Sequence, residues 1–288
     1  MLHNSSSPYE GIPDTLRSVG IGLPAASIPE FLATQPSIGW VEVQAESYMY
    51  VPVAVRALAA VRRDYDLSLH SVGLSLGSTD GLQSEHMRRL ASLVTALEPQ
   101  LVSDHLSWST TGGKFLNALL PLPYTTEALH VVCRNIDATQ HALGRKILVE
   151  NVTAYVRFRH SEMTETEFLM EVVQRTGCGI LCDVNNIYVS SLNFGTDPLN
   201  FIRAISPDAV GQFHLGGHSR IRCGDKWLLF DDHGSSVTPA VWELYRVVLN
   251  MLGAKPTLIE WDTNRPSLAV LLAEARRASE TTLKLSKE

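Results

Sequence analysis

Short apolar runs alternate with longer amphipathic stretches along most of the chain. The runs cover residues 19–23, 40–45, 67–72, 101–106, 146–151, 179–184, 210–215 and 256–261. Apolar residues recur at helical spacing in the stretches 53–64, 84–97, 126–142 and 165–175. Strands that alternate with helices predict a parallel α/β sheet, and eight of them favour closure into a (β/α)8 TIM barrel.

No change in composition marks a domain boundary, so we expect residues 1–288 to form a single TIM-barrel domain. Residues 1–17 are typical of a flexible lead, and residues 277–288 of the frayed end of a closing helix. The stretch 216–230 is irregular and long for a strand-to-helix loop, and such loops often serve a site. An open doubly wound sheet is the alternative, but GIGLPAAS after the first strand lacks the glycine spacing of a dinucleotide site.

The composition restricts the partners of the protein. A formal net charge of −6 argues against a protein that coats nucleic acid. No apolar run approaches the roughly 20 residues of a membrane helix, and the first residues show no signal-peptide pattern. We interpret the cysteines as reduced, mostly buried thiols in a cytoplasmic protein, because none forms a CxxC pair: Cys133, Cys178, Cys182 and Cys223.

Polar residues gather at the ends of the third to eighth predicted strands and in the loop after the seventh. The carboxyl ends of barrel strands converge on one face, so these side chains should become neighbours. The set comprises His70, Asp104, His105, Glu150, Asp183, Asn185, Asn186, His214, His218, Asp231, Asp232, His233, Glu260 and Asp262.

Such a set is typical of a metal centre. Carboxylates that share a pocket repel one another unless a cation lies among them, and neutral imidazoles add ligand atoms. Histidine and carboxylate ligands without cysteine suit iron, manganese or zinc. There are more ligands than one six-coordinate ion takes, so two or three ions with bridging carboxylates fit better. Each residue taken alone could be a hydrogen-bonded core histidine or a helix cap. That explanation would have to hold at six successive strand ends, which makes it weak.

Other polar and aromatic residues are less clearly placed. Glu46 either contacts the site residues or caps a helix, and the sequence leaves both open. Three tryptophans either wall the site or pack in the core: Trp108, Trp227 and Trp261. We expect the remaining histidines on the surface: His3, His86, His130, His141 and His160.

Several strings in order resemble one enzyme family. They are SLHSVGLSLG, SDHLSW, LPLPYTTEAL, ILVENVTAY, CDVNNIYVSSLNFG, QFHLGGH, DDHG and PTLIEWD, between about Gly20 and about Ala275. The chain is similar there to the multinuclear non-heme iron-dependent oxidases, one of which acts in methanobactin biosynthesis. The resemblance implies a barrel with two or three irons, in Fe(II) and Fe(III) states, and O2 as co-substrate. It also implies a cysteine-containing, ribosomally made precursor peptide as substrate and a separate protein that recruits it.

The resemblance also implies a role for each ligand by position. His70, His105 and Glu150 would bind one iron, and Asp183, His214 and Glu260 a second, with Glu150 as the bridge. Asn186, Asp231 and His233 would bind a third, where the neighbouring Asp232 leaves the choice of aspartate less secure. Apart from the resemblance, four further residues are candidates for supporting the ligands: Glu46, Asp104, Asn185 and Asp262. Oxygen activation favours iron, because zinc has no redox chemistry.

Two other functions compete with this one. A metal-dependent hydrolase or isomerase could use the same barrel. Zinc phosphodiesterases that cut damaged DNA have similar ligands, but the net charge of −6 weakens that version. A sugar isomerase would prefer carboxylates, and this set is rich in histidine. A binding module that has lost its chemistry should lack ligands, yet no expected position is missing.

Overall fold

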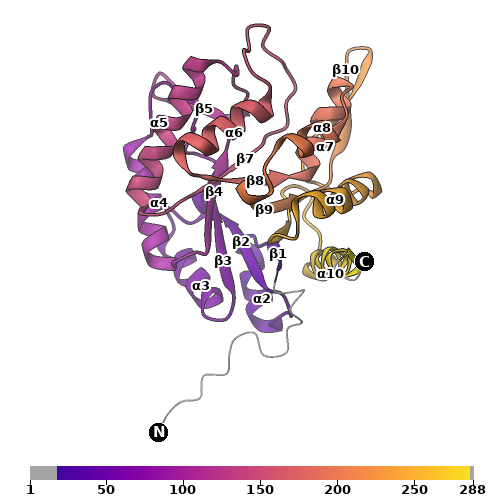
Figure 1. The fold of residues 1–288 in the computed structure, drawn as a ribbon. Coiled ribbons are helices and arrows are strands. Elements are labelled where there is room, and N and C mark those ends of the chain that lie inside the picture. The colour runs from indigo at the N-terminus through magenta and orange to yellow at the C-terminus, as the bar shows by residue number, and fades with distance from the viewer. Residues whose placement is uncertain (1–17, 286–288) are drawn as a thin grey trace.

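The computed structural model describes residues 18–285, and eight parallel strands in it close into a barrel with helices outside (Figure 1). Around the barrel the order is β1-β12-β9-β8-β7-β4-β3-β2. The strands are β1 (Val19–Gly22), β2 (Trp40–Gln44), β3 (Asp66–His70), β4 (Leu101–His105), β7 (Leu148–Glu150), β8 (Gly179–Asp183), β9 (Val210–Leu215) and β12 (Thr257–Ile259). Each falls within or next to one of the eight predicted runs, so the predicted TIM barrel is confirmed.

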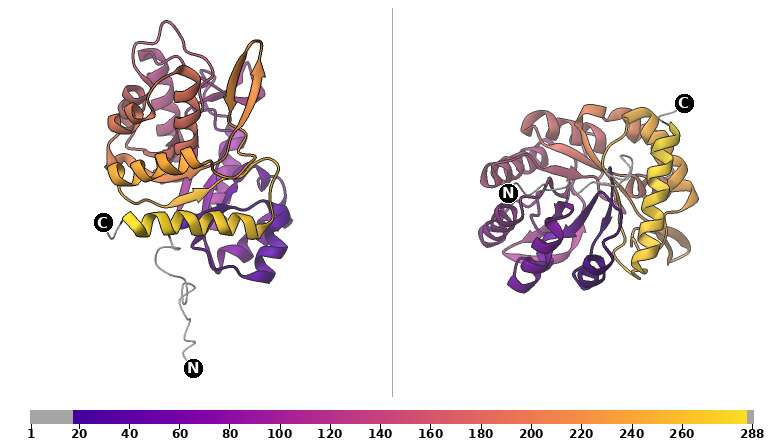
Figure 2. Two further views of the ribbon diagram at one scale, coloured as in Figure 1. Left: turned by 90° about the vertical axis from the view of Figure 1, so that its right-hand side faces the viewer. Right: turned by 90° about the horizontal axis from the view of Figure 1, so that it is seen from below.

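The helices form a ring around the strands, as the view from below in Figure 2 shows. They are α2 (Ile28–Thr34), α3 (Pro52–Arg62), α4 (Ser84–Leu97), α5 (Thr126–Leu143), α6 (Glu165–Thr176), α7 (Val184–Phe194), α8 (Pro198–Ala204), α9 (Pro239–Leu252) and α10 (Leu268–Leu285). Short 3-10 turns are η1 (Ala25–Ser27), η2 (Ala45–Ser47) and η3 (Pro207–Ala209). Helix α10 packs along β1 and β12, where the barrel closes.

Local sequence signals set the helix ends. Thr164 and Glu167 form a capping box at the start of α6, in which each side chain accepts from the other's backbone N–H. Gly177 ends that helix with φ of 67°, in the left-handed region that glycine adopts without strain. Two residues after this glycine, Gly179 begins β8 and pairs with Leu148 of β7.

Towards the amino ends of the strands, apolar side chains fill the interior of the barrel. Leu148 of β7 fills space left by two glycines, since a Cβ at Gly179 or Gly211 would lie 2.5 or 2.7 Å from its Cδ2. Such filling makes the interior a packed core rather than a pore. The polar cluster therefore lies at one end of a solid barrel.

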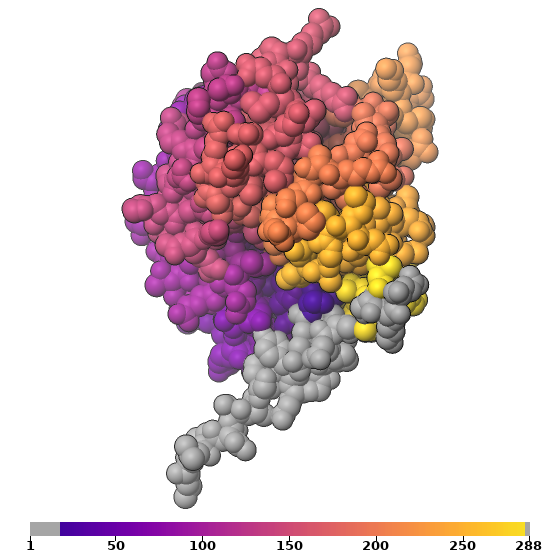
Figure 3. Space-filling model, viewed as in Figure 1, coloured from indigo at the N-terminus to yellow at the C-terminus, as the bar shows by residue number. Residues whose placement is uncertain are grey.

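Two antiparallel hairpins extend beyond the barrel. One is formed by β5 (Trp108–Thr111) and β6 (Lys114–Leu120), and the other by β10 (Ser219–Cys223) and β11 (Lys226–Phe230). The second projects at the upper right of the space-filling view in Figure 3. The stretch 216–230, expected to be irregular, is therefore largely this hairpin. Many side chains of this hairpin are exposed, such as Trp227 at 59%, so apolar and polar residues do not alternate along it in the way that marks a strand in a sequence.

The terminal expectations fall partly outside the described residues. The lead predicted at 1–17 and residues 286–288 lie beyond residues 18–285. Residues 277–285, which we expected to fray, form the last part of α10. Within the described chain, no helix combines the length and apolarity needed to cross a membrane.

Candidate metal centre

The first group of side chains comes from three adjacent strand ends. His70, His105 and Glu150 are the last residues of β3, β4 and β7, and all three are buried. The Nε2 atoms of His70 and His105 lie 3.3 Å apart. Each lies 3.4 Å from Oε2 of Glu150. Ligands about 2.1 Å from one ion lie about 3.0–3.4 Å from one another, so this triangle has the size of a metal site.

Neighbouring strand residues hold the two imidazoles in place. Nδ1 of His70 lies 2.7 Å from Oγ of Ser103, so its Nε2 faces the cluster. Asp104 accepts from the backbone N–H of His105 and of Leu74. Its carboxylate is 3.7 Å from Nδ1 of His105, an ion-pair distance that is too long for a hydrogen bond. Asp104 thus fixes the loop after β3 and the backbone at His105.

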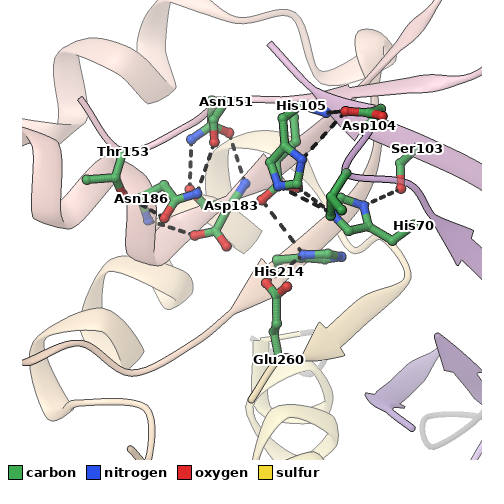
Figure 4. A network of polar contacts seen from close by, with 12 residues as sticks. His70, Ser103, Asp104, His105, Asn151, Thr153, Asp183, Asn186, His214 and Glu260 are labelled. Atoms are coloured by element: carbon green, nitrogen blue, oxygen red, sulfur yellow. Dashed lines mark hydrogen bonds and ion pairs between the residues drawn. The ribbon is translucent and has the colours of Figure 1, made fainter. Parts of the chain in front are cut away.

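The second group shares Glu150 with the first. Ligand atoms of Glu150, Asp183, His214 and Glu260 all lie within 4.8 Å of one another. Nδ1 of His214 is 3.0 Å from Oε2 of Glu260 and 3.9 Å from Oε1 of Glu150. Figure 4 shows His70, His105 and His214 converging on one centre, with Glu260 below. The barrel therefore brings together all six residues expected at the first two positions.

A buried carboxylate that the sequence analysis missed stands behind His214. Oε1 of Glu42, in β2, lies 3.0 Å from Nε2 of His214, and its Oε2 accepts from Nε2 of Gln212 at 2.8 Å. Glu42 is only 4% exposed. The available signal was a charged residue in the middle of the apolar run WVEVQ, whose side chain must point into the barrel because its neighbours pack outside.

Asp183 has two roles at once. Its Oδ1 accepts from the backbone N–H of Asn186 and so caps α7, which begins directly after β8. Its Oδ2 is buried without a hydrogen-bond partner among residues 18–285, 3.7 Å from Nε2 of His233. The cap and the cluster are therefore not alternatives for this residue, since each uses one oxygen.

The third group is centred on His233. Its Nε2 lies 2.7 Å from Asp231, and its Nδ1 lies 3.2 Å from Glu260 and 3.5 Å from Asp262. Asp232 instead contacts the backbone of Gly234 and the side chain of Thr263. The geometry thus favours Asp231 over Asp232, and it places Asp262 within reach of the same histidine.

The two asparagines after β8 point to different partners. Asn186 donates to the carbonyl of Asn151 and accepts from Thr153, on the far side of Asp183 from the histidines in Figure 4. Asn185 donates to Asp231 at 2.8 Å, and its Oδ1 lies 2.7 Å from Nδ1 of His218. In this arrangement the side chain of Asn185 contacts the His233 group, and that of Asn186 faces Asn151 and Thr153. His218, left undecided by the sequence, lies behind Asn185.

Glu46 and His86 form a pair beside the first group. Oε1 of Glu46 accepts from Oγ of Ser71 and from the backbone N–H of Val72, and it lies 3.2 Å from Nε2 of His86. Because Ser71 follows His70, Glu46 supports that strand end rather than capping a helix. The expectation that His86 lies on the surface is wrong, since its side chain is only 15% exposed and packs here. His130, His141 and His160 are exposed as expected, and His3 lies outside the described residues.

A cavity of about 540 Å³ opens beside the cluster. It is lined by His70, His105 and Glu260, together with Trp261 of the loop after β12. Trp108 and Trp227 are absent from its lining: Trp108 donates its indole N–H to Pro121, and Trp227 is exposed on its hairpin. Of the three tryptophans considered for the site, only Trp261 therefore lines this cavity.

Burial makes two carboxylates of the cluster reluctant to ionise, whereas at Glu260 the charges of His233 and His214 outweigh burial and hold its pKa well below its usual range. Burial raises the pKa of Glu150 to about 8 and that of Asp183 to about 7. Burial lowers the pKa of His105, but the charge of Glu150 outweighs this effect and raises it to about 9. Oε2 of Glu150 and Oδ2 of Asp183 have no hydrogen-bond partner in the described chain. Buried acceptors of this kind, facing imidazole nitrogens, fit the donor set of bound cations.

The fold and this cluster define a TIM-barrel protein whose strand ends carry a candidate metal centre. Residues 18–283 match the model of the family described as RiPP precursor modification enzyme MbnB/TglH/ChrH, and the chain belongs to this family. RiPPs are ribosomally synthesised and post-translationally modified peptides. The chain is 48% identical to a UPF0276 protein of Anaeromyxobacter sp. (strain Fw109-5) and 44% identical to one of Vibrio parahaemolyticus, each over 91% of both chains.

Solved structures share the fold at low sequence identity. An L-ribulose 3-epimerase matches with a TM-score of 0.63 and 13% identity, over 93% of this chain and 96% of that one. Endonuclease IV from Thermus thermophilus matches with a TM-score of 0.58 and 16% identity, over 92% and 98%. At these identities the likeness shows the barrel alone.

Proposed function

We propose that this protein is a multinuclear iron-dependent oxidase that uses O2 to modify cysteine residues of a ribosomally made precursor peptide. The observation that carries the proposal is the set of three overlapping ligand groups in which Glu150 and Glu260 each belong to two. A shared carboxylate is what a bridge between two cations requires. Membership of a family of precursor-peptide modification enzymes supports the substrate class.

Each iron would have its own ligands. His70, His105 and Glu150 would hold the first. Asp183, His214 and Glu260 would hold the second, with Glu150 between the two.

Asn186, Asp231 and His233 would hold a third iron. For this, the Asn186 side chain must first turn away from Thr153, because its Oδ1 accepts a hydrogen bond from the Thr153 hydroxyl.

Bound iron would supply the redox capacity for O2 and an open position for a substrate thiolate, whose pKa a cation lowers. The protein's own residues keep the site ordered. Ser103 and Glu42 hold the outer nitrogens of His70 and His214. None of the four cysteines belongs to a ligand group: three are buried and Cys223 lies on a hairpin, so all four should be dispensable.

The remaining parts of the proposal concern partners and place. A separate protein would present the peptide, as the resemblance implies; the eight strands of the barrel pair only with one another, so free strand edges are left to the two hairpins. The four free thiols are typical of a reducing compartment, and we propose that the protein works in the cytoplasm.

The test uses the full chain produced in iron-sufficient cells. Elemental analysis should find two to three irons per chain. The iron-loaded chain is mixed with the recruiting protein and the cysteine-containing peptide whose genes neighbour its own, with and without O2. Mass spectrometry should show a change in peptide mass that requires O2, the recruiting protein and the peptide's cysteines.

Three results would contradict the proposal. Zinc as the sole metal, retained when iron is in excess, would exclude the redox centre. A mass change that proceeds without any oxidant, or on a peptide whose cysteines are replaced by serine, would favour a hydrolase or isomerase on the same barrel. Full activity without the recruiting protein would remove the partner from the proposal.

A further inference from the structure

The cavity beside the cluster brings one arginine close to the candidate metal centre. Arg265, in the loop between β12 and α10, lines the cavity together with His70, His105 and Glu260. It is the one lysine or arginine in this lining, and it is exposed to solvent. A molecule that binds in the cavity can therefore contact the ligand groups and the guanidinium at the same time.

The loop that carries Arg265 has a restricted backbone. The N–H of Asp262 donates to the carbonyl of His233 at 2.8 Å, which ties the loop to the site. Asn264 has a φ of 46°, in the left-handed region that asparagine adopts more readily than most residues. Pro266 follows Arg265, and a residue before proline is restricted to extended backbone. A preorganised backbone lowers the entropy that Arg265 loses when it binds a partner.

The guanidinium lies on the side of the cavity that is formed by the η2 turn. Tyr48 follows that turn and also lines the cavity. Burial raises the pKa of Tyr48 to about 12, while the charge of Arg265 acts in the opposite direction and lowers it. Such an effect requires the guanidinium to lie near the phenol ring, so its charge faces the cavity rather than the outer surface.

The acids of the cavity already have partners, whereas the guanidinium has none. Glu42 and Glu260 each lie 3.0 Å from a nitrogen of His214, and Asp262 lies 3.5 Å from Nδ1 of His233. Within residues 18–285, the guanidinium forms no hydrogen bond or ion pair. A guanidinium stays charged in proteins, so the unmatched charge in this cavity is positive and favours an anionic group on the ligand.

We propose that Arg265 binds a carboxylate of the precursor peptide close to the cysteine that is modified. This inference rests on the proposed function, since it assumes a peptide in the cavity. A guanidinium donates two parallel N–H bonds to one carboxylate, which fixes the orientation of the ligand as well as its distance. With its thiolate at the irons and its carboxylate at Arg265, the peptide would be held at two points.

The size of the cavity limits where this carboxylate lies in the peptide. A cavity of about 540 Å³ spans on the order of 10 Å, and an extended chain advances about 3.3 Å per residue. The carboxylate should therefore lie within about three residues of the cysteine. It belongs either to an aspartate or glutamate side chain or to the carboxyl end of the peptide.

The test removes the charge of the arginine. Arg265→Gln is prepared as iron-loaded protein and assayed with O2, the recruiting protein and the neighbouring-gene peptide. Loss of a charged hydrogen bond at an exposed residue should raise KM about tenfold, with kcat within about twofold of wild type. Arg265→Lys keeps the charge but not the paired donors, so its KM should lie between the two. Iron content should stay unchanged, because Arg265 belongs to no ligand group.

Modified peptides show whether the arginine acts through a carboxylate. Each carboxylate near the cysteine is replaced in turn by its amide, as Asp→Asn, Glu→Gln or an amidated carboxyl end. The amide that raises the wild-type KM about tenfold should cause no further rise with Arg265→Gln, and it identifies which carboxylate is bound. Arg276→Gln is the matched control, since it removes the same charge from α10 outside the cavity lining, and it should keep the wild-type KM.

The outcomes separate this inference from the proposed function. Wild-type protein that lacks iron or leaves the peptide unchanged contradicts the proposed function itself. An active wild type with an unchanged KM in Arg265→Gln overturns only the inference. A rise in KM that is equal for the native and the amide peptides also overturns it, because the arginine then acts by general attraction or by shaping the loop. A native peptide without a carboxylate within about three residues of the modified cysteine overturns it as well.

Discussion

Replacing Glu42 tests whether a carboxylate behind a histidine tunes the metal centre. The Glu42 carboxylate lies 3.0 Å from Nε2 of His214, whose Nδ1 faces Glu260 at the same distance. Burial lowers the pKa of His214, but the charges of Glu42 and Glu260 outweigh this and raise it well above its usual range. If Nδ1 binds iron, Nε2 keeps its proton and donates a hydrogen bond to the carboxylate of Glu42. The carboxylate then fixes the tautomer and strengthens the imidazole as a ligand.

The expected size of the effect follows from this arrangement. Glu42→Gln keeps the shape of the side chain and an acceptor oxygen, so the ring orientation should persist while the charge is lost. Partners of this kind change metal affinity by about 10–100-fold, or about 1.4–2.8 kcal/mol. We expect a loss near the lower bound for Glu42→Gln. Glu42→Ala should lie near the upper bound, because it also leaves Gln212 without its acceptor.

The assay is anaerobic competition for Fe(II) between the protein and a chelator, with bound iron counted by elemental analysis. Glu30→Gln is the matched control, since it makes the same chemical change on the exposed face of α2. Urea unfolding of the metal-free proteins checks that each variant folds. An iron affinity for Glu42→Gln within about twofold of wild type, in a folded protein, would refute the claim that Glu42 acts through His214.

Three further predictions use the same preparations. Glu150→Gln should lower iron occupancy at two positions together, because an amide bridges poorly, whereas the exposed His130→Gln should retain all iron; equal losses would contradict the bridging role. Asp231→Asn should release iron at lower chelator concentration than Asp232→Asn, because only Asp231 contacts His233, and the reverse order would reassign the ligand. Burial raises the pKa of Glu165, away from the cluster, to about 7, so its protonated form is favoured in the folded state. Wild-type stability relative to Glu165→Gln should therefore fall by about 3 kcal/mol between pH 4.5 and 8, measured by urea unfolding, and a constant difference would show that this carboxyl is solvated.

The barrel could be predicted from the sequence because its signals are local. Each strand is a short apolar run, and each predicted helix carries its own periodicity, as in Ser84–Leu97, where prediction and structure coincide. Helix α7 was harder, because it begins directly after β8 with no intervening loop. The hairpin β10–β11 was missed since both of its faces are largely exposed, which removes the alternation that marks a strand.

The candidate site likewise contains residues that the sequence could predict and residues that it could not. Residues at strand ends, such as His70 and His105, could be predicted because the topology alone makes them neighbours. The partners of side chains within a loop or helix turn could not, because a rotation of about 100° per residue decides between Asn185 and Asn186. Glu42 was overlooked for another reason: its role depends on which strand lies across the barrel from it, and Gln212 is 170 positions away along the chain.

The two ends of this barrel contribute differently to stability. Towards the amino ends of the strands, Leu148 packs into space left by Gly179 and Gly211, and such close packing stabilises the fold. At the carboxyl ends, buried carboxylates with raised pKa values oppose folding until a cation neutralises them. Metal bound by Glu150 and Glu260 would therefore contribute to folding free energy as well as to chemistry. Substitutions in the cluster should accordingly lower the stability of the iron-loaded protein much more than that of the metal-free protein.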